Sequence, residues 1–262
     1  MTEYRLDMQD TKREIDWHGF NIIAGPCSIE SYESLYATAL ELKQMGIRML
    51  RGGAYKLRTS LHSFRGLGDA GVLHLSQVAK ELDLISVSEC TQIDKLEYMS
   101  RHLDVLVVGT RNMHNYPLLE ALAQVPNPVI LKRGIAATYS EWQAAAEYLM
   151  QYGKQDLVLC ERGIRCFESE TRYTLDISAL PVMQRKCGLP VYIDPSHASG
   201  DRDLVPALAL AAVAAGANGL MLEAAINPCT SICDASQTIS LDTLGRLLKQ
   251  IQAVRSAISK DV

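Results

Sequence analysis

Eight short apolar runs, rich in β-branched residues, recur along the chain from residue 21 onward. Each run has the length of a strand and is bounded by polar residues, glycine or proline. Runs that are apolar throughout, without alternation, are typical of strands buried on both faces of a parallel sheet. The predicted strands cover residues 21–25, 47–52, 84–89, 104–109, 128–132, 156–161, 190–194 and 219–223.

Segments with helical spacing of apolar residues separate these runs. Residues 32–45, for example, place Leu35, Ala39 and Leu42 on one face. Strands that alternate with helices predict a parallel sheet covered by helices, and eight such units favour a (β/α)8 barrel over an open doubly wound sheet. Further helices are predicted at residues 70–84, 139–152, 203–215 and 241–258.

The composition agrees with a single domain. The 262 residues are 48% hydrophobic, and α/β barrels of this length are routinely one domain. Because no linker, low-complexity segment or change in composition divides the sequence, we expect residues 1–262 to form one barrel domain without a separate regulatory domain. Residues 1–20 would be an N-terminal extension, and the weak alternation of apolar residues within it favours a β-hairpin.

Charge and cysteine content indicate which partners and which cellular compartment to expect. The net charge is −4 and no block of like charge occurs, which argues against a nucleic-acid or membrane partner. No apolar run approaches the ~18 residues that span a bilayer, and the polar N-terminus is unlike a secretory signal. Seven cysteines, an odd number, favour reduced thiols. We therefore expect a cytoplasmic protein, and we also expect a homo-oligomer, either a dimer or a tetramer.

Polar and thiol residues end or follow all eight predicted strands. In a barrel the active site lies at the carboxyl ends of the strands, so this distribution predicts a site there. One group of residues is cationic. Several positive charges gathered at one end of the barrel would suit the phosphate or carboxylate groups of a substrate. This group consists of Arg51, Lys56, Arg58, Arg111, Lys132 and Arg162.

A second group combines a thiol, an imidazole and two carboxylates, namely Cys27, His197, Glu223 and Asp234. These ligand types together suit Mn2+, Fe2+, Co2+ or Zn2+ better than Ca2+ or Mg2+. Spacing alone leaves other roles open, because no C-x-x-C or H-x-x-H pattern links them. Cys27 is equally consistent with a buried apolar position, His197 with a loop cap, and Asp234 with a turn or helix cap.

Other motifs exclude alternatives. No G-x-S-x-G, P-loop or G-x-G-x-x-G motif occurs in the required setting, which argues against a hydrolase, a kinase and a dinucleotide enzyme. The other cysteines are predicted to be structural, among them Cys160 in a strand and Cys187 at the end of a helical segment. Cys229 and Cys233 flank the Asp234 loop, so a link to the metal is the alternative to the favoured structural role.

Six motifs follow one another along the chain: AGPCSIES at 24–31, the loop at 56–68, GTRN at 109–112, LKRG at 131–134, CERGIR at 160–165 and DPSH at 194–197. Together they resemble the motifs of one enzyme family, the short, type Iβ 3-deoxy-D-arabino-heptulosonate 7-phosphate (DAHP) synthases. The resemblance runs from about residue 21 to the C-terminus. It implies the condensation of phosphoenolpyruvate with erythrose 4-phosphate, which opens the shikimate pathway.

The resemblance also implies roles for individual residues. Cys27, His197, Glu223 and Asp234 would bind one divalent metal ion. Arg58 and Thr59 would bind the phosphate of the sugar. Lys56, Cys27 and His197 would take part in catalysis. Phosphoenolpyruvate would be held by Arg51, Lys56, Arg111, Lys132 and Arg162.

Four positions depart from the family pattern and leave the aldose phosphate open. Leu57 and Leu61 stand where prolines are usual, Ala225 replaces a histidine and Ala235 a glycine. The related 3-deoxy-D-manno-octulosonate 8-phosphate (KDO8P) synthases use arabinose 5-phosphate, and residues 62–66 resemble theirs. In the KDO8P synthases, however, two residues separate the lysine of this loop from the next arginine. Here only Leu57 separates Lys56 from Arg58, which favours the four-carbon sugar. A paralogue that uses another aldose phosphate and a non-catalytic barrel that acts as a binding subunit are the alternatives.

Overall fold

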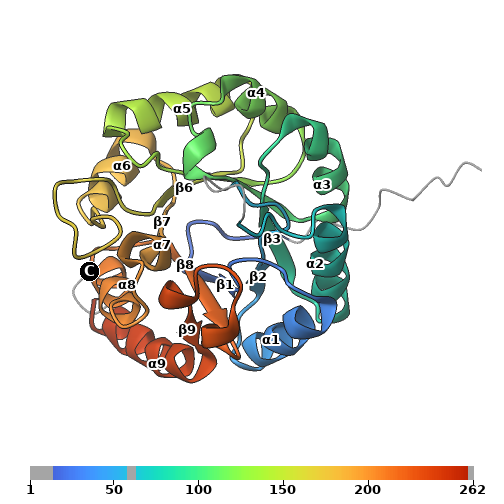
Figure 1. The fold of residues 1–262 in the computed structure, drawn as a ribbon. Coiled ribbons are helices and arrows are strands. Elements are labelled where there is room, and N and C mark those ends of the chain that lie inside the picture. The colour runs from blue at the N-terminus through green and yellow to red at the C-terminus, as the bar shows by residue number, and fades with distance from the viewer. Residues whose placement is uncertain (1–13, 58–62, 259–262) are drawn as a thin grey trace, which may run out of the picture.

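The protein is a closed barrel of parallel strands surrounded by helices (Figure 1). The computed structural model describes residues 14–57 and 63–258. Strands β1 to β8 pair in chain order, and β8 pairs with β1 to close the ring. All eight predicted strands are confirmed, with shifts at their ends. They are Asn21–Gly25, Met49–Arg51, Ile85–Glu89, Val105–Val108, Val129–Lys132, Leu157–Glu161, Val191–Ile193 and Gly219–Ala225. A two-residue strand, β9 (Ile239–Ser240), pairs with the end of β8.

The helices form the outer ring, as the sequence predicts for a (β/α)8 barrel. The five predicted helices correspond to α1 (Tyr32–Gln44), α2 (Asp69–Glu81), α5 (Tyr139–Gln151), α8 (Val205–Ala214) and α9 (Leu241–Ile258). Four shorter helices were not predicted individually: α3 (Leu96–His102), α4 (Tyr116–Gln124), α6 (Ala179–Cys187) and α7 (Pro195–Ser199). None of the helices in the described ranges is long and apolar enough to cross a membrane.

The segment before β1 closes the amino-terminal end of the barrel. Residues 14–20 contain bends and no strand, and the rest of the predicted hairpin lies outside the described residues. Trp17 is buried and its ring lies 6.0 Å from that of Tyr192. Both rings belong to the apolar cluster that fills the barrel interior, so the opposite end is the one left open for polar chemistry. The prediction that the whole chain is one domain stays a prediction.

A glycine allows β1 and β2 to approach closely where the site begins. Gly25 ends β1 with a φ of 151°, and a Cβ atom there would lie 2.1 Å from the carbonyl oxygen of Arg51. A side chain would therefore force the two strand ends apart. This close pairing brings the residues that follow β1, including Cys27, next to the end of β2.

Candidate active site

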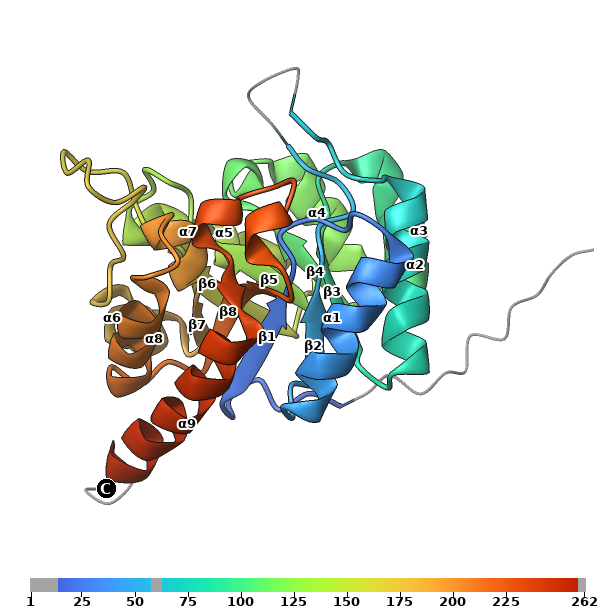
Figure 2. The same ribbon diagram turned by 60° about the horizontal axis from the view of Figure 1, so that its bottom comes forward.

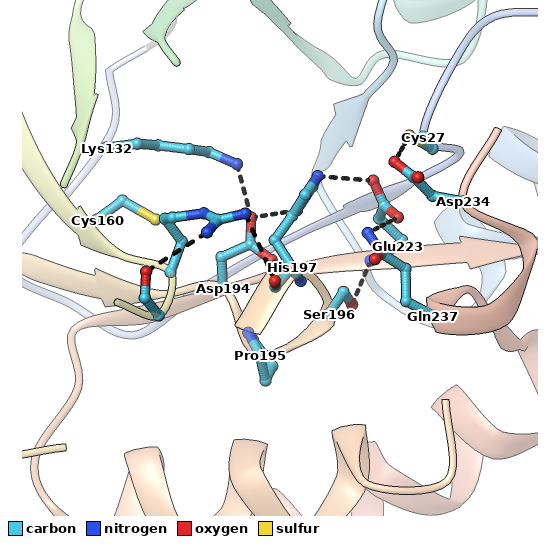
Figure 3. A network of polar contacts seen from close by, with 12 residues as sticks. Cys27, Lys132, Cys160, Asp194, Pro195, Ser196, His197, Glu223, Asp234 and Gln237 are labelled. Atoms are coloured by element: carbon cyan, nitrogen blue, oxygen red, sulfur yellow. Dashed lines mark hydrogen bonds and ion pairs between the residues drawn. The ribbon is translucent and has the colours of Figure 1, made fainter. Parts of the chain in front are cut away.

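Four potential metal ligands converge at the carboxyl-terminal end of the barrel. Cys27 follows β1, His197 lies in α7, Glu223 lies in β8 and Asp234 lies in the loop between β8 and β9. One ligand atom from each lies within 4.8 Å of the others, and Figure 3 shows Glu223 and Asp234 from the β8 side facing His197 and Cys27. The structure therefore brings together four residues that span positions 27 to 234 in the sequence.

The local sequence around α7 orients His197. Asp194 precedes the helix and accepts a hydrogen bond from the backbone N–H of His197 at 3.0 Å. Its other oxygen, Oδ2, lies 2.7 Å from His197 Nδ1. Burial lowers the pKa of His197, although Asp194 and Glu223 oppose this shift. The imidazole is therefore neutral near pH 7, and because a carboxylate only accepts, Nδ1 carries its proton.

The second ring nitrogen of His197, Nε2, lies where a bound cation would be expected. His197 Nε2 faces Glu223 Oε1 at 3.3 Å with a lone pair, and Glu223 is completely buried. Among the residues that the structure describes, Glu223 Oε1 has no hydrogen-bond partner, although Arg51 Nη2 lies 3.0 Å from it. Two electron-pair donors in contact, beside a thiol and a second carboxylate, suit a divalent transition metal. These four residues therefore fit a metal site.

The thiol of Cys27 is held between an acid and an ammonium group. Its Sγ donates to Asp234 Oδ2 at 3.0 Å, and Lys56 Nζ lies 2.9 Å from Sγ. A hydrogen bond with Cys233, burial and the charge of Glu223 raise the pKa of Cys27 well above its ordinary value. Burial works against ionisation of Asp234 too, but the hydrogen bond from Cys27 and the charge of Lys56 lower the pKa of Asp234 to about 2. Metal binding at Cys27 would release the thiol proton.

Five of the six predicted cations lie in the described residues; three of those five are buried, Lys56 is half-buried and Arg111 is exposed. Arg51 ends β2, Lys132 ends β5 and Arg162 follows β6. Arg51, Lys56, Lys132 and His197 line one pocket. Arg111, in the 3₁₀ turn after β4, is exposed at the rim. Arg58 and Thr59, with Leu61, fall outside the described residues, so their predicted contacts are untested.

Of the three buried cations in this group, Arg162 has the fewest groups that could balance its charge. Its guanidinium donates to the carbonyl oxygens of Gly163 and His197 at 3.4 and 3.5 Å and lies 4.2 Å above the ring of Tyr173. Across residues 14–57 and 63–258 it pairs with no carboxylate. Burial lowers the pKa of Arg162, as expected of a charge that lacks a close counterion. A bound anion would supply one, and a phosphate group matches the guanidinium fork.

Three functional neighbours were missed at the sequence level. Asp194 accepts from Lys132 Nζ at 2.6 Å as well as from His197. Gln237 donates to Glu223 Oε2 at 2.7 Å, and Cys233, predicted to be structural, hydrogen-bonds with Cys27. Asp194 stands in the DPSH motif, which offered a signal. Cys233 directly precedes Asp234 in the sequence, which offered a signal as well. Gln237 had none, because its proximity to Glu223 depends on how the loop after β8 folds back. Cys160, predicted to be structural, is part of the buried barrel interior.

Known proteins resemble this chain in sequence and in fold. Residues 15–260 match the DAHP synthetase I family. The phospho-2-dehydro-3-deoxyheptonate aldolase of Thermotoga maritima is 41% identical over 257 residues, which are 98% of this chain and 75% of that protein. Its crystal structure superposes with a TM-score of 0.89 over 92% of this chain and 71% of its own. The 2-dehydro-3-deoxyphosphooctonate aldolase of Desulfosudis oleivorans is 29% identical over 257 residues, 91% of each chain.

Proposed function

The chain belongs to the DAHP synthetase I family, and we propose that the residues at the carboxyl-terminal end of its barrel carry out the family's reaction. The enzyme condenses phosphoenolpyruvate with erythrose 4-phosphate, giving DAHP and phosphate, the first step of the shikimate pathway. A carbon–carbon bond forms between C3 of phosphoenolpyruvate and the aldehyde carbon. Water adds at C2, and phosphate leaves by cleavage of its bond to carbon.

The buried cations are proposed to bind phosphoenolpyruvate. The observation that carries this assignment is Arg162, a buried guanidinium without a carboxylate partner among the described residues. Lys132 points into the same region from β5, and the buried Nη1 atom of Arg51 has no hydrogen-bond partner within residues 14–57 and 63–258. Together with Lys56 and the exposed Arg111, these groups would neutralise the phosphate and carboxylate and hold C3 against the aldehyde.

Cys27, His197, Glu223 and Asp234 are proposed to hold one divalent cation, either Mn2+, Co2+, Fe2+ or Zn2+. The bound ion would polarise the aldehyde oxygen as a Lewis acid. The chain itself prepares the ligands. Asp194 keeps His197 in the tautomer with a free Nε2 atom, and Lys56, 2.9 Å from Cys27 Sγ, favours the thiolate once the proton has left.

The metal role is tested by comparing two buried cysteines. Cys27→Ala should abolish turnover and remove the thiolate-to-cobalt absorption of Co2+-loaded protein, because the sulfur ligand is lost. Cys160→Ala is the matched control, since Cys160 is equally buried but belongs to the apolar interior. It should keep both signals. Unchanged activity of Cys27→Ala with full Co2+ content would assign Cys27 a packing role.

Erythrose 4-phosphate is tested against longer sugars. Consumption of phosphoenolpyruvate should be fastest with erythrose 4-phosphate and much slower with arabinose 5-phosphate or ribose 5-phosphate. If Arg58 and Thr59 bind the sugar phosphate, Arg58→Ala should raise the Michaelis constant of the aldose by roughly 10- to 100-fold, since hydrogen bonds to charged groups contribute ~1.5–3 kcal/mol. Faster turnover with a five-carbon aldose would replace the erythrose assignment. We place this reaction in the cytoplasm and expect a homo-oligomer.

A further inference from the structure

Gln237 and Arg172 join the two carboxylates of the proposed metal site by direct contacts. Gln237 is almost fully buried, and its Nε2 donates to Glu223 Oε2 at 2.7 Å. Its Oε1 accepts from Arg172 Nη1 at 2.9 Å. The same guanidinium nitrogen lies 3.8 Å from Asp234 Oδ1. A chain of contacts therefore runs from Glu223 through Gln237 and Arg172 to Asp234.

The direction of these hydrogen bonds is fixed by chemistry. A carboxylate can only accept and a guanidinium can only donate, so a residue that bridges them must present one donor and one acceptor. The amide of Gln237 does so, and rotating it by half a turn would break both hydrogen bonds. Glutamate or leucine at this position could satisfy at most one partner. The amide thus holds Glu223 so that its other oxygen, Oε1, faces His197.

The backbone around both residues is held in place as well. The N–H of Arg172 donates to the carbonyl oxygen of Ser199 at 2.9 Å, and the N–H of Gln237 donates to that of Asp234 at 3.1 Å. A Cβ atom on Gly200 would lie 2.7 Å from Arg172 Cβ, so the stem of Arg172 packs directly on the end of α7. Ser199 and Gly200 closely follow His197 in the chain. The pair is therefore fastened to the helix that carries the imidazole ligand.

We propose that Gln237 and Arg172 act as a positioning pair, which aligns the carboxylates of Glu223 and Asp234 for binding a divalent cation; the proposal rests on the proposed metal role of these carboxylates. Neither residue touches the reacting atoms. Partners that orient metal ligands typically change metal affinity 10- to 100-fold when they are lost. A pair that acts through one shared hydrogen bond should also show non-additive effects.

The experiment measures the dissociation constant of Co2+ for the metal-free full-length protein, from the thiolate-to-cobalt absorption during titration against a chelator. Gln237→Met keeps the side-chain length and removes both hydrogen bonds, and it should weaken Co2+ binding by roughly 10- to 100-fold. Arg172→Met should cause a smaller loss. The double variant should match Gln237→Met alone. Removing a cation near a metal site would by charge alone strengthen binding, so weaker binding by Arg172→Met indicates positioning.

Gln184→Met is the matched control. Gln184 donates two hydrogen bonds, to Gly216 and Asn218 at 2.9 Å, at the amino-terminal end of β8. This variant should lose stability towards urea without a change in Co2+ affinity. Wild-type affinity in Gln237→Met, or an equal loss in Gln184→Met, overturns the positioning role while leaving the metal site in place. A wild-type protein that binds no Co2+ overturns the metal assignment and this inference together.

Discussion

The buried carboxylate of Asp194 contacts one residue from each of the two groups of the candidate active site. Its Oδ2 accepts from Lys132 at 2.6 Å and from His197 at 2.7 Å. Burial works against its ionisation, but the electrostatic attraction of His197 and Lys132 and the hydrogen bond with His197 lower the pKa of Asp194 well below its ordinary value. The carboxylate therefore stays charged and holds a proposed substrate-binding cation and a proposed metal ligand in fixed positions. At this scale, the site depends on polar groups that share partners.

Arg162 gives the prediction that belongs to single residues. Arg162→Ala should raise the Michaelis constant for phosphoenolpyruvate by roughly 10- to 100-fold and change that for the aldose little, because a bidentate contact to phosphate is lost. Arg162→Lys should recover only part of the loss, since an ammonium group lacks the planar fork. Arg185→Ala on α6, an exposed arginine, is the control in steady-state kinetics. A change confined to the aldose would mean that the two phosphate sites are assigned the wrong way round.

The elements divide the work between the two ends of the barrel. The loop after β6, drawn in yellow in Figure 2, lies at the end where the 3₁₀ turns after β8 also lie. It is fastened by the bridge between Ile164 and Thr174 and by Asp176, which accepts from Arg133 at 2.9 Å. At the other end, residues 14–20 close the interior with Trp17. Stability at one end and chemistry at the other is the arrangement expected of this fold.

Trp17 tests that division. Trp17→Ala should lower the free energy of unfolding by about 3–5 kcal/mol, because a buried ring is lost and a cavity is left against Tyr192. The Michaelis constants at temperatures where the variant stays folded should match those of the wild type. Urea denaturation followed by steady-state kinetics measures both quantities. Phe167→Ala, at a side chain that is 99% exposed, should leave the unfolding free energy unchanged, and equal losses in the two variants would contradict a closing role for Trp17.

At the scale of the whole molecule, the pH dependence of stability is set by a few buried charges rather than by the net charge. The chain carries −4 overall, but its buried charges concentrate at one end of the barrel. Arg51 with Glu223 and Lys132 with Asp194 form ion pairs at 3.0 and 2.6 Å. Burial works against ionisation of the two carboxylates, but the positive groups around them lower the pKa of both Glu223 and Asp194. The folded state therefore depends on pH through the active site.

Asp234 allows the direction of this pH dependence to be predicted and measured. Its pKa is about 2 in the folded protein against an ordinary value of 3.8, so the unfolded chain binds the proton more readily as pH falls. The stabilisation is complete above the ordinary pKa and is lost as pH falls towards the folded pKa. Between pH 5 and pH 3 the contribution of Asp234 should fall by about 1 kcal/mol.

The measurement compares wild-type protein and Asp234→Asn, both metal-free, by urea denaturation at several pH values. The variant should lose less stability than the wild type on going from pH 5 to pH 3, by about 1 kcal/mol. Parallel pH profiles for the two proteins would show that Asp234 is not held as a stabilised carboxylate.

The sequence by itself determined the strands of the barrel and predicted the end at which the proposed chemistry lies. Buried parallel strands must be apolar along their whole length, so runs such as residues 104–109 and 156–161 are visible without knowledge of their neighbours. Polar residues at their carboxyl ends, among them Lys132 and Arg162, follow from the same rule, since all strands of a parallel barrel point the same way. The four ligand candidates were visible as residue types.

Only the tertiary structure decided which of these residues meet. Cys27 and Asp234 are 207 positions apart, and their contact at 3.0 Å depends on closing the ring between β1 and β8. Gln237 carries no sequence signal, because an amide at a turn is ordinary until the loop after β8 folds onto Glu223. Local patterns encode which face of an element is buried, whereas the contacts between loops depend on the packing of the complete barrel. For that reason the strands and the five longer helices could be predicted, with shifts at their ends, and the positioning contacts around the proposed metal site could not.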